Sequence, residues 1–383
     1  MSLRETKRYS RTLWNLYDTF RVPSFARRHF PPVILYDVLD KLVFQSHGLI
    51  QIRMAGKSFE GRPINLLTVG TGKTKVFLWS QMHGDESTAT MAACDILSYL
   101  VKHRRDAEVQ TILSKLTLHF LPMLNPDGAE RTQRRTAQSI DMNRDAEALC
   151  TPEAQLLKAL QRKLRPQFGF NLHDQELSTV ASSKNITAIA VLAPAFDVKK
   201  STNAVRTRAK HLTAAFSTIV EQFVPDKVGR YDDTFEPRAF GDNMQKWGTS
   251  TMLIESGHAL NDPEKNSIRK LNAVGMLATF YALATGEYGS SSIEAYESLP
   301  FNGKRVYDVV IRNVQIDYGN GRKTRADLGI WYQVDTHSEN PPRLIDLGDL
   351  HTFIGMKEVD GKGKIISAKK LILGAKFDWE KYF

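Results

Sequence analysis

The chain contains very little cysteine, with only Cys94 and Cys150 among its 383 residues. Two thiols cannot build a disulfide framework in a chain of this length. They also cannot build the cage of several thiolates that holds a structural zinc ion. Any metal site in this chain must therefore use histidine and carboxylate ligands.

Long hydrophobic runs are also missing. Residues 1–8 carry charge but no apolar stretch of the kind a signal peptide needs. The longest uncharged, mostly apolar run covers residues 271–286 and includes Asn272. It falls short of the roughly 18 apolar residues that a membrane span requires. We therefore expect a buried helix over this run, no membrane span, and a cytoplasmic location.

The third absence concerns charge patterning. The formal net charge is +10, which in general can favour nucleic acids, membrane surfaces or anionic substrates. However, no stripe of basic residues interleaved with aromatics is present, and no known nucleic-acid module is recognisable. We therefore expect no nucleic-acid partner and no membrane partner, while the oligomeric state stays open. A hydrophobic fraction of 42% and a charged fraction of 25% exclude a largely disordered chain.

The order of sequence patterns indicates several parts. Residues 1–45 are predicted to form an N-terminal helical lead-in packed on the domain that follows. Over residues 46–288, short apolar β-type runs alternate with helical stretches, which is typical of an α/β domain with a largely buried sheet. A run of small residues then suggests a linker, and residues 289–383 are predicted to form a small β-rich accessory domain. In it, Gly319-Asn320-Gly321 is typical of a hairpin turn.

Polar residues with metal-binding or acid–base chemistry follow several of the predicted strands. His83 and Glu86 stand three residues apart in a loop, where they could reach one metal ion; alternatively, Glu86 could cap the next helix. His173 leaves a second apolar run, and Glu255 ends a third. Functional sites in open α/β sheets are built at such strand ends. Alternatively, His173 could be a structural histidine whose hydrogen bonds are satisfied within the protein, and Glu255 could be an ordinary glutamate at a strand end.

Two further motifs lie between these residues. The Asn-Pro-Asp-Gly sequence at 125–128 is by itself only a turn. Arg134 and Arg135 follow, and then Asp-Met-Asn-Arg at 141–144. A guanidinium group matches a carboxylate bidentately, so this stretch could hold the carboxylate of a small molecule. A solvated basic loop is the alternative.

The order of all these motifs over residues 82–257 resembles that of the zinc carboxypeptidase family, the carboxypeptidase A-like metallopeptidases. Residues 56–64, Gly-Lys-Ser-Phe-Glu-Gly-Arg-Pro-Ile, are similar to that family's early strand–turn–strand segment. The resemblance covers about residues 45–286 and leaves the C-terminal part outside. It implies an α/β fold with a mixed, mostly parallel twisted sheet flanked by helices, next to the small β-rich domain.

The resemblance also implies roles for individual residues. His83, Glu86 and His173 match the three ligands of a single zinc ion, and two histidines with one glutamate are the protein ligands that carboxypeptidase A itself uses. Asp141 matches the carboxylate that holds a zinc-bound histidine from behind, and Glu255 matches the general base.

The same comparison implies how a substrate is held. Asn143 and Arg144 match the pair that grips the terminal carboxylate, and Arg134 matches the arginine that stabilises the oxyanion, with Arg135 as the substitute. Tyr231 is the candidate for a tyrosine that caps the bound substrate, because it is the only tyrosine in residues 229–242.

The implied activity is that of a zinc-dependent metallocarboxypeptidase, which hydrolyses the C-terminal amide bond of peptides with a zinc-activated water and Glu255 as base. One alternative is a zinc deacylase of N-acyl amino acids, similar to aspartoacylase and succinylglutamate desuccinylase. Another is a catalytically silent binding protein. For either enzyme, the expected partner is a peptide or N-acyl amino acid with a free carboxylate.

Overall fold

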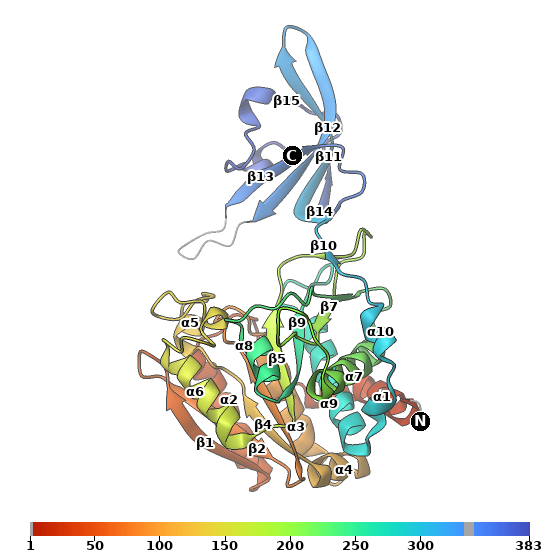
Figure 1. Ribbon diagram of the computed structural model, residues 1–383. Coiled ribbons are helices and arrows are strands. Elements are labelled where there is room, and N and C mark those ends of the chain that lie inside the picture. The colour runs from red at the N-terminus through yellow and green to blue at the C-terminus, as the bar shows by residue number, and fades with distance from the viewer. Residues whose placement is uncertain (1–2, 333–340) are drawn as a thin grey trace. The chain divides into compact units, whose positions relative to one another are not determined.

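The structure is a computed structural model that describes residues 3–332 and 341–383. The chain divides into two compact units (Figure 1). Unit 1 consists of Met1–Gln175 and Ala188–Phe301, and unit 2 consists of Glu176–Thr187 and Asn302–Phe383. An excursion from the middle of the chain therefore folds with the C-terminal residues.

A mixed sheet forms the centre of unit 1. Its strands, across the described residues, are β1 (Ile50–Lys57), β2 (Pro63–Val69), β3 (Thr74–Ser80), β4 (Leu116–Leu121), β5 (Phe168–Asp174), β7 (Ile189–Leu192), β8 (Val228–Arg230) and β9 (Ser250–Ser256). They lie in the order β1-β2-β4-β3-β5-β9-β7-β8. Strands β4, β3, β5 and β9 are mutually parallel, as are β7 and β8, and the other neighbours are antiparallel. The predicted mixed, mostly parallel sheet is confirmed.

Helices cover both faces of this sheet (Figure 1). The α-helices among the described residues of unit 1 are α1 (Arg4–Phe20), α2 (Pro32–Ser46), α3 (Thr88–Lys102), α4 (Ala107–Lys115), α5 (Pro126–Glu130), α6 (Pro152–Leu164), α7 (Ala204–Val220), α8 (Phe240–Lys246), α9 (Asn266–Thr285) and α10 (Ile293–Glu297). Apolar side chains of α1 to α4, α7 and α9 join one core cluster, and those of α6 and α8 join a second cluster on the opposite face.

Strand alternation decides which side chains reach each face. Along β5, Phe170 and Leu172 belong to the first core cluster, so Asn171 and His173 point to the opposite face. On the neighbouring β3, Trp79 belongs to the second cluster on that opposite face. The polar residues of β5 therefore lie on the side of the sheet that α6 and α8 cover.

A buried polar network joins the N-terminal lead-in to the rest of unit 1. Asp95 on α3 accepts hydrogen bonds from the Nε and Nη2 atoms of Arg269 on α9, at 2.7 and 2.6 Å. The same carboxylate accepts from the Tyr17 hydroxyl and from the Val22 backbone N–H, both at 2.7 Å. Asp95 and Arg269 are both fully buried. Three segments that are distant in sequence are thus held by one carboxylate.

We expect Asp95→Ala to lower the free energy of unfolding of unit 1 by about 3–5 kcal/mol, because it leaves a buried guanidinium without its counter-charge. Urea denaturation followed by circular dichroism measures this loss. Asp18→Ala, which removes an exposed carboxylate from the same region, should change the free energy by no more than about 0.5 kcal/mol. Equal losses of stability from the two substitutions would contradict the role of Asp95 as the buried counter-charge of Arg269.

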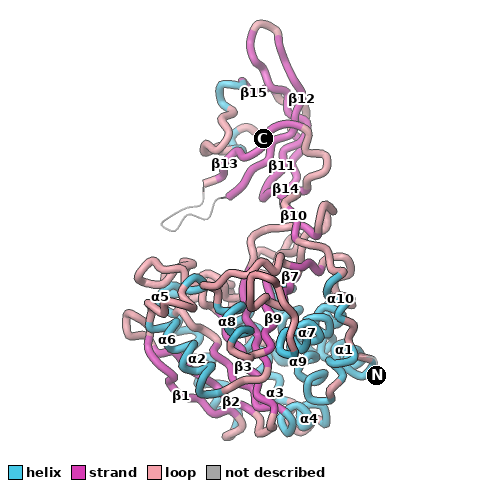
Figure 2. The backbone as a smooth tube through the Cα atoms, in the orientation of Figure 1, coloured by secondary structure: helices cyan, strands magenta, loops and turns pink. Residues whose placement is uncertain are grey.

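Unit 2 is rich in strands (Figure 2). Its described strands are β6 (Thr179–Val180), β10 (Asn302–Gly303), β11 (Val306–Gly319), β12 (Arg322–Tyr332), β13 (Pro342–Gly348), β14 (Ile354–Asp360) and β15 (Ile365–Ser367). β6 pairs with β10, while the other five form one sheet around β11. The turn between β11 and β12 has positive φ at Gly319, Asn320 and Gly321, which is the backbone that the sequence predicted for a hairpin. The predicted β-rich C-terminal region is confirmed.

We found no helix in residues 3–332 and 341–383 that is both long and apolar enough to cross a membrane.

Candidate metal centre

Three potential metal ligands come together at the carboxyl ends of two neighbouring parallel strands. His83 and Glu86 lie in the loop between β3 and α3, and His173 lies near the end of β5. Because β3 and β5 are parallel neighbours, their ends meet at one edge of the sheet. The three sequence-predicted ligands are thereby close in space although 87 residues separate Glu86 from His173.

The loop that carries His83 is braced by the Asn-Pro-Asp-Gly turn. Asn125 donates from Nδ2 to the Met82 carbonyl at 3.2 Å, and its Oδ1 accepts from the Gly128 N–H at 2.9 Å. Gly84 packs so closely on this turn that an added Cβ would lie 2.0 Å from the Gly128 carbonyl carbon. Gly84 and Gly128 therefore allow the two backbone segments to approach each other closely, and this contact fixes the loop that carries His83.

The Asn-Pro-Asp-Gly turn also forms hydrogen bonds and an ion pair with the segment at residues 56–64. Asp127 accepts hydrogen bonds from the Ser58 hydroxyl at 2.7 Å and from the Glu60 backbone N–H at 2.9 Å. The same buried carboxylate pairs with Arg62 Nη1 at 2.6 Å. Two motifs that appeared separate in the sequence thus form one support.

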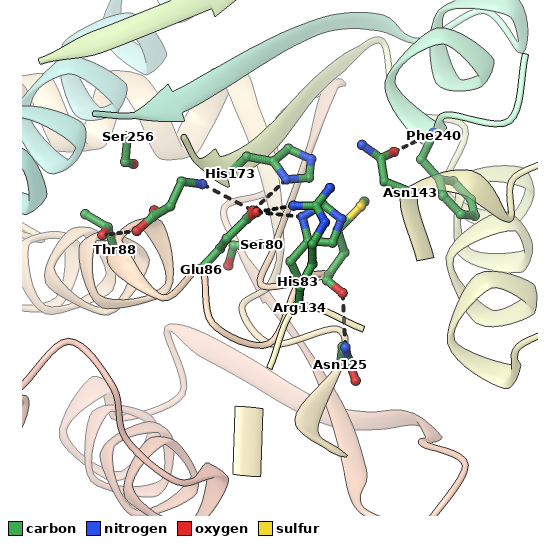
Figure 3. A network of polar contacts seen from close by, with 12 residues as sticks. Ser80, His83, Glu86, Thr88, Asn125, Arg134, Asn143, His173, Phe240 and Ser256 are labelled. Atoms are coloured by element: carbon green, nitrogen blue, oxygen red, sulfur yellow. Dashed lines mark hydrogen bonds and ion pairs between the residues drawn. The ribbon is translucent and has the colours of Figure 1, made fainter. Parts of the chain in front are cut away.

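The geometry of the cluster is compact (Figure 3). The Nδ1 atom of His83 lies 2.7 Å from Glu86 Oε1, and the Nδ1 atom of His173 lies 2.8 Å from Glu86 Oε2. One ligand atom from each residue lies within 4.8 Å of the other two, and all three side chains are buried. The Glu86 carboxylate thus joins the two imidazole rings.

The donor set fits a zinc ion. Two imidazoles and one carboxylate, with the fourth position left for water, are the ligands of many catalytic zinc sites. Burial by itself would raise the pKa of Glu86, but the two histidines outweigh this effect and hold the pKa well below its usual range. Burial lowers the pKa of His173. A charged carboxylate beside a neutral imidazole is the state in which both can bind a metal.

Asp141 supports His83 from the other side of the ring. Its Oδ1 lies 3.0 Å from His83 Nε2 and also accepts the Asn143 backbone N–H at 2.9 Å. Burial opposes ionisation of both groups. Even so, the Glu86 charge and the hydrogen bonds to Asp141 and Glu86 raise the pKa of His83 to about 9. The hydrogen bond with His83 in turn holds the pKa of Asp141 below its usual range. Asp141 therefore fixes which nitrogen of His83 faces the cluster.

Arg134 is the arginine that reaches the cluster. Its Nη1 lies 3.0 Å from Glu86 Oε1, and its Nη2 lies 3.2 Å from Asp141 Oδ2. About 43% of the side chain is exposed, so one side of the guanidinium still faces solvent. Arg135 instead donates from Nη1 to the Ser139 carbonyl at 3.1 Å, within its own loop. The structure thus places the first arginine of the pair at the cluster.

Asn143 and Arg144 lie on η1 (Met142–Arg144), which begins directly after Asp141. The Oδ1 atom of Asn143 accepts the Phe240 backbone N–H at 2.9 Å, which ties η1 to the start of α8. Arg144 is half exposed and lies 3.5 Å from the Glu236 carboxylate, measured from Nε to Oε2. The loop before α8 therefore supplies the counter-charge of Arg144, a partner that the sequence did not indicate.

Glu255 lies on β9 directly opposite His173 of β5. Its Oε2 atom is buried and has no hydrogen-bond partner within the described part of the chain. Burial, and then the negative charge of Glu86, raises the pKa of Glu255 well above its usual range. A carboxylate with a buried, unpartnered oxygen and a raised pKa, beside three candidate metal ligands, is suited to accept a proton.

Tyr231 follows β8, and its backbone N–H donates to the Val191 carbonyl at 3.1 Å. The loop after it is anchored by Arg206, which is buried and pairs with Asp233 at 2.5 Å. The structure therefore places Tyr231 at the root of this loop, and its capping role stays a prediction.

Sequence reasoning missed a set of polar groups behind the cluster. Asp174 accepts from the Thr88 hydroxyl at 2.5 Å and from Lys265 Nζ at 3.3 Å, and its N–H donates to Glu86 Oε2 at 3.2 Å. Lys265 is buried although it is charged in water, and burial lowers its pKa. The position of Asp174, directly after His173, was the available signal.

Comparison with known proteins places these features in context. The zinc carboxypeptidase family model matches residues 35–183. Carboxypeptidase A2 of Rattus norvegicus is 34% identical over 100 residues, which cover 24% of this chain and 23% of the rat protein. The chain therefore spans about a quarter of the length of that curated relative.

Solved structures share the fold. A metallo-carboxypeptidase from Burkholderia cenocepacia has a TM-score of 0.52 at 19% identity, covering 65% of this chain and 69% of that chain. A metallo-carboxypeptidase from Pseudomonas aeruginosa, in complex with (2-guanidinoethylmercapto)succinic acid, has a TM-score of 0.50 at 18% identity, covering 65% and 68%. At these identities the likeness shows the α/β fold.

Proposed function

We propose that the chain is a zinc-dependent metallocarboxypeptidase that removes C-terminal residues from peptides, and the match of the zinc carboxypeptidase family model to residues 35–183 supports this proposal. The observation that carries the proposal is the position of Glu255. It stands in direct register with His173, on the strand next to the one that supplies this ligand. A base beside a two-histidine, one-carboxylate cluster is what hydrolysis of an amide by water requires.

The roles of the residues follow from their contacts. A zinc ion held by His83, Glu86 and His173 would supply a polarised water of lowered pKa. Glu255 accepts the proton of the attacking water and returns it to the leaving amine, for which its raised pKa is suited. Asp141 keeps His83 in one orientation.

Two arginines bind the negative charges of the reacting peptide. Arg134 stands beside Glu86 with part of its guanidinium exposed, so it can donate hydrogen bonds to the developing oxyanion. Arg144, positioned with Asn143 by η1, binds the terminal carboxylate in exchange for Glu236. Fixing that carboxylate at a set distance from the base restricts cleavage to the last amide bond.

The test compares one peptide in two forms, with a free and with an amidated C-terminus, incubated with the zinc-loaded protein. We expect release of the last amino acid from the free peptide, and a kcat/KM at least about 100-fold lower for the amidated one, because the partner of Arg144 is missing. Mass spectrometry of the products measures both rates.

The same assay separates the alternatives. Rapid hydrolysis of N-acetylaspartate without cleavage of peptides would show a deacylase and contradict the proposal. Binding of zinc and peptide without hydrolysis of any substrate would show a binding protein. Internal cleavage of the amidated peptide would contradict the role of Arg144.

A further inference from the structure

A buried amide without a partner lies on the same face of the sheet as the metal cluster. Asn171 is fully buried, and neither its Nδ2 nor its Oδ1 has a hydrogen-bond partner among residues 3–332 and 341–383. On β5 it precedes His173 by two positions, so both side chains point to one face. A buried polar group left unpaired costs about 1–3 kcal/mol, so its position calls for a ligand.

The surroundings of this amide belong to the proposed substrate site. Asn171 stands in register with Leu253 of β9, two positions before Glu255, and with Trp79 of β3. Across from the sheet lies Gly241 at the start of α8, where an added Cβ would be 3.1 Å from Asn171 Nδ2 and 3.4 Å from Pro194 Cγ. Gly241 therefore packs closely on the amide, and a side chain at this position would crowd Asn171.

The clamp for the terminal carboxylate adjoins the same point. Asn143 is bound to the backbone N–H of Phe240, the residue before Gly241. A peptide whose carboxylate is held by Asn143 and Arg144, and whose last amide bond is near Glu255, must place its last side chain between these elements. Asn171 and Gly241 lie in that interval.

We propose that Asn171 forms hydrogen bonds with the side chain of the released residue. The protein then prefers C-terminal residues with a neutral carboxamide, asparagine or glutamine. This inference rests on the proposed carboxypeptidase function. The amide of Asn171 offers donors on Nδ2 and an acceptor on Oδ1, which a second carboxamide satisfies together. Trp79 and Leu253 beside it are uncharged, so a charged side chain would enter without a counter-charge from these neighbours.

The experiment measures kcat/KM for peptides that differ only in the last residue, comparing asparagine with its near-isostere leucine, and glutamine with methionine. We expect the wild-type protein to favour the carboxamide in each pair by about tenfold or more, because an apolar side chain leaves the buried amide unpaired. In Asn171→Leu the ratio should fall at least tenfold. Each ratio is taken within one protein sample, so partial loss of zinc or of folded protein cancels.

Two further variants make the test sharper. Asn15→Leu makes the same chemical change at an exposed position of α1 and should keep the wild-type ratio. Gly241→Ala places a methyl group against Asn171 Nδ2 and should lower kcat/KM for the carboxamide peptides more than for a peptide that ends in glycine. This second variant keeps the inference testable if Asn171→Leu does not fold.

The outcomes distinguish the two levels of the proposal. Cleavage of all peptides at equal rates, a preference for leucine or for lysine, or an unchanged ratio in Asn171→Leu would overturn the role of Asn171 while leaving the carboxypeptidase activity established. Cleavage of no peptide by the wild-type protein would overturn the carboxypeptidase proposal, and the inference with it.

Discussion

Replacement of Glu255 by glutamine is expected to lower kcat for peptide cleavage by about 10²–10⁴-fold, the usual contribution of a general acid–base group. Glutamine keeps the size of the side chain but cannot accept the proton of the attacking water. The carboxylate it replaces has an unpartnered, buried Oε2 and a pKa raised first by burial and then by Glu86. Steady-state kinetics with a free-C-terminus peptide, at equal zinc content, measures the loss.

The variant should still bind zinc, because Glu255 is not one of the three residues whose ligand atoms cluster. The free energy of unfolding of this variant should change little, since an uncharged amide is easier to bury than a carboxylate. Glu130→Gln, the same change at an exposed position at the end of α5, is the matched control and should retain the wild-type kcat. Wild-type kcat in Glu255→Gln would remove this residue from the mechanism and direct the search to another base.

The ligand positions were predictable because each depends on local order and on one general property of parallel sheets. His83 and Glu86 share a short loop between a strand and a helix, and His173 ends a strand. Parallel neighbours bring such ends to one edge. The order of motifs along the chain, through its resemblance to the zinc carboxypeptidases, was therefore enough to predict which side chains meet, without knowledge of the exact register.

The choice between Arg134 and Arg135 could not be made from spacing. The loop that carries them contains two non-glycine residues with left-handed backbone, Thr132 with φ 50° and Ser139 with φ 62°. These turns decide which arginine points to Glu86. Residues with such φ values carry no clear sequence signal unless they are glycine or asparagine.

Which segments of the chain form unit 2 could be predicted only in part. The hairpin at residues 319–321 follows from local turn chemistry. The pairing of Thr179–Val180 with Asn302–Gly303 joins segments more than 100 residues apart, and two-residue strands have no periodic pattern to detect. The same limit applies to Asn171, because its significance lies in the contacts that it lacks and not in its residue type.

Replacement of His173 by alanine is expected to abolish tight zinc binding and, with it, peptide cleavage. The side chain supplies one of the three donor atoms that lie within 4.8 Å of one another, and two remaining protein ligands are fewer than catalytic zinc sites use. Zinc content after dialysis and affinity from competition with a chromogenic chelator measure the change.

A graded series tests whether this loss comes from ligation. Asp141→Asn keeps all three ligands but weakens the hold on His83 Nε2, so zinc affinity should fall by about 10–100-fold. His351→Ala, which removes an exposed histidine of unit 2, should bind zinc as the wild type does. Zinc should also raise the melting temperature of the wild type and not that of His173→Ala, because a ligand stabilises only the state that binds it. Wild-type zinc affinity in His173→Ala would contradict the metal centre, since it would show that zinc is held elsewhere.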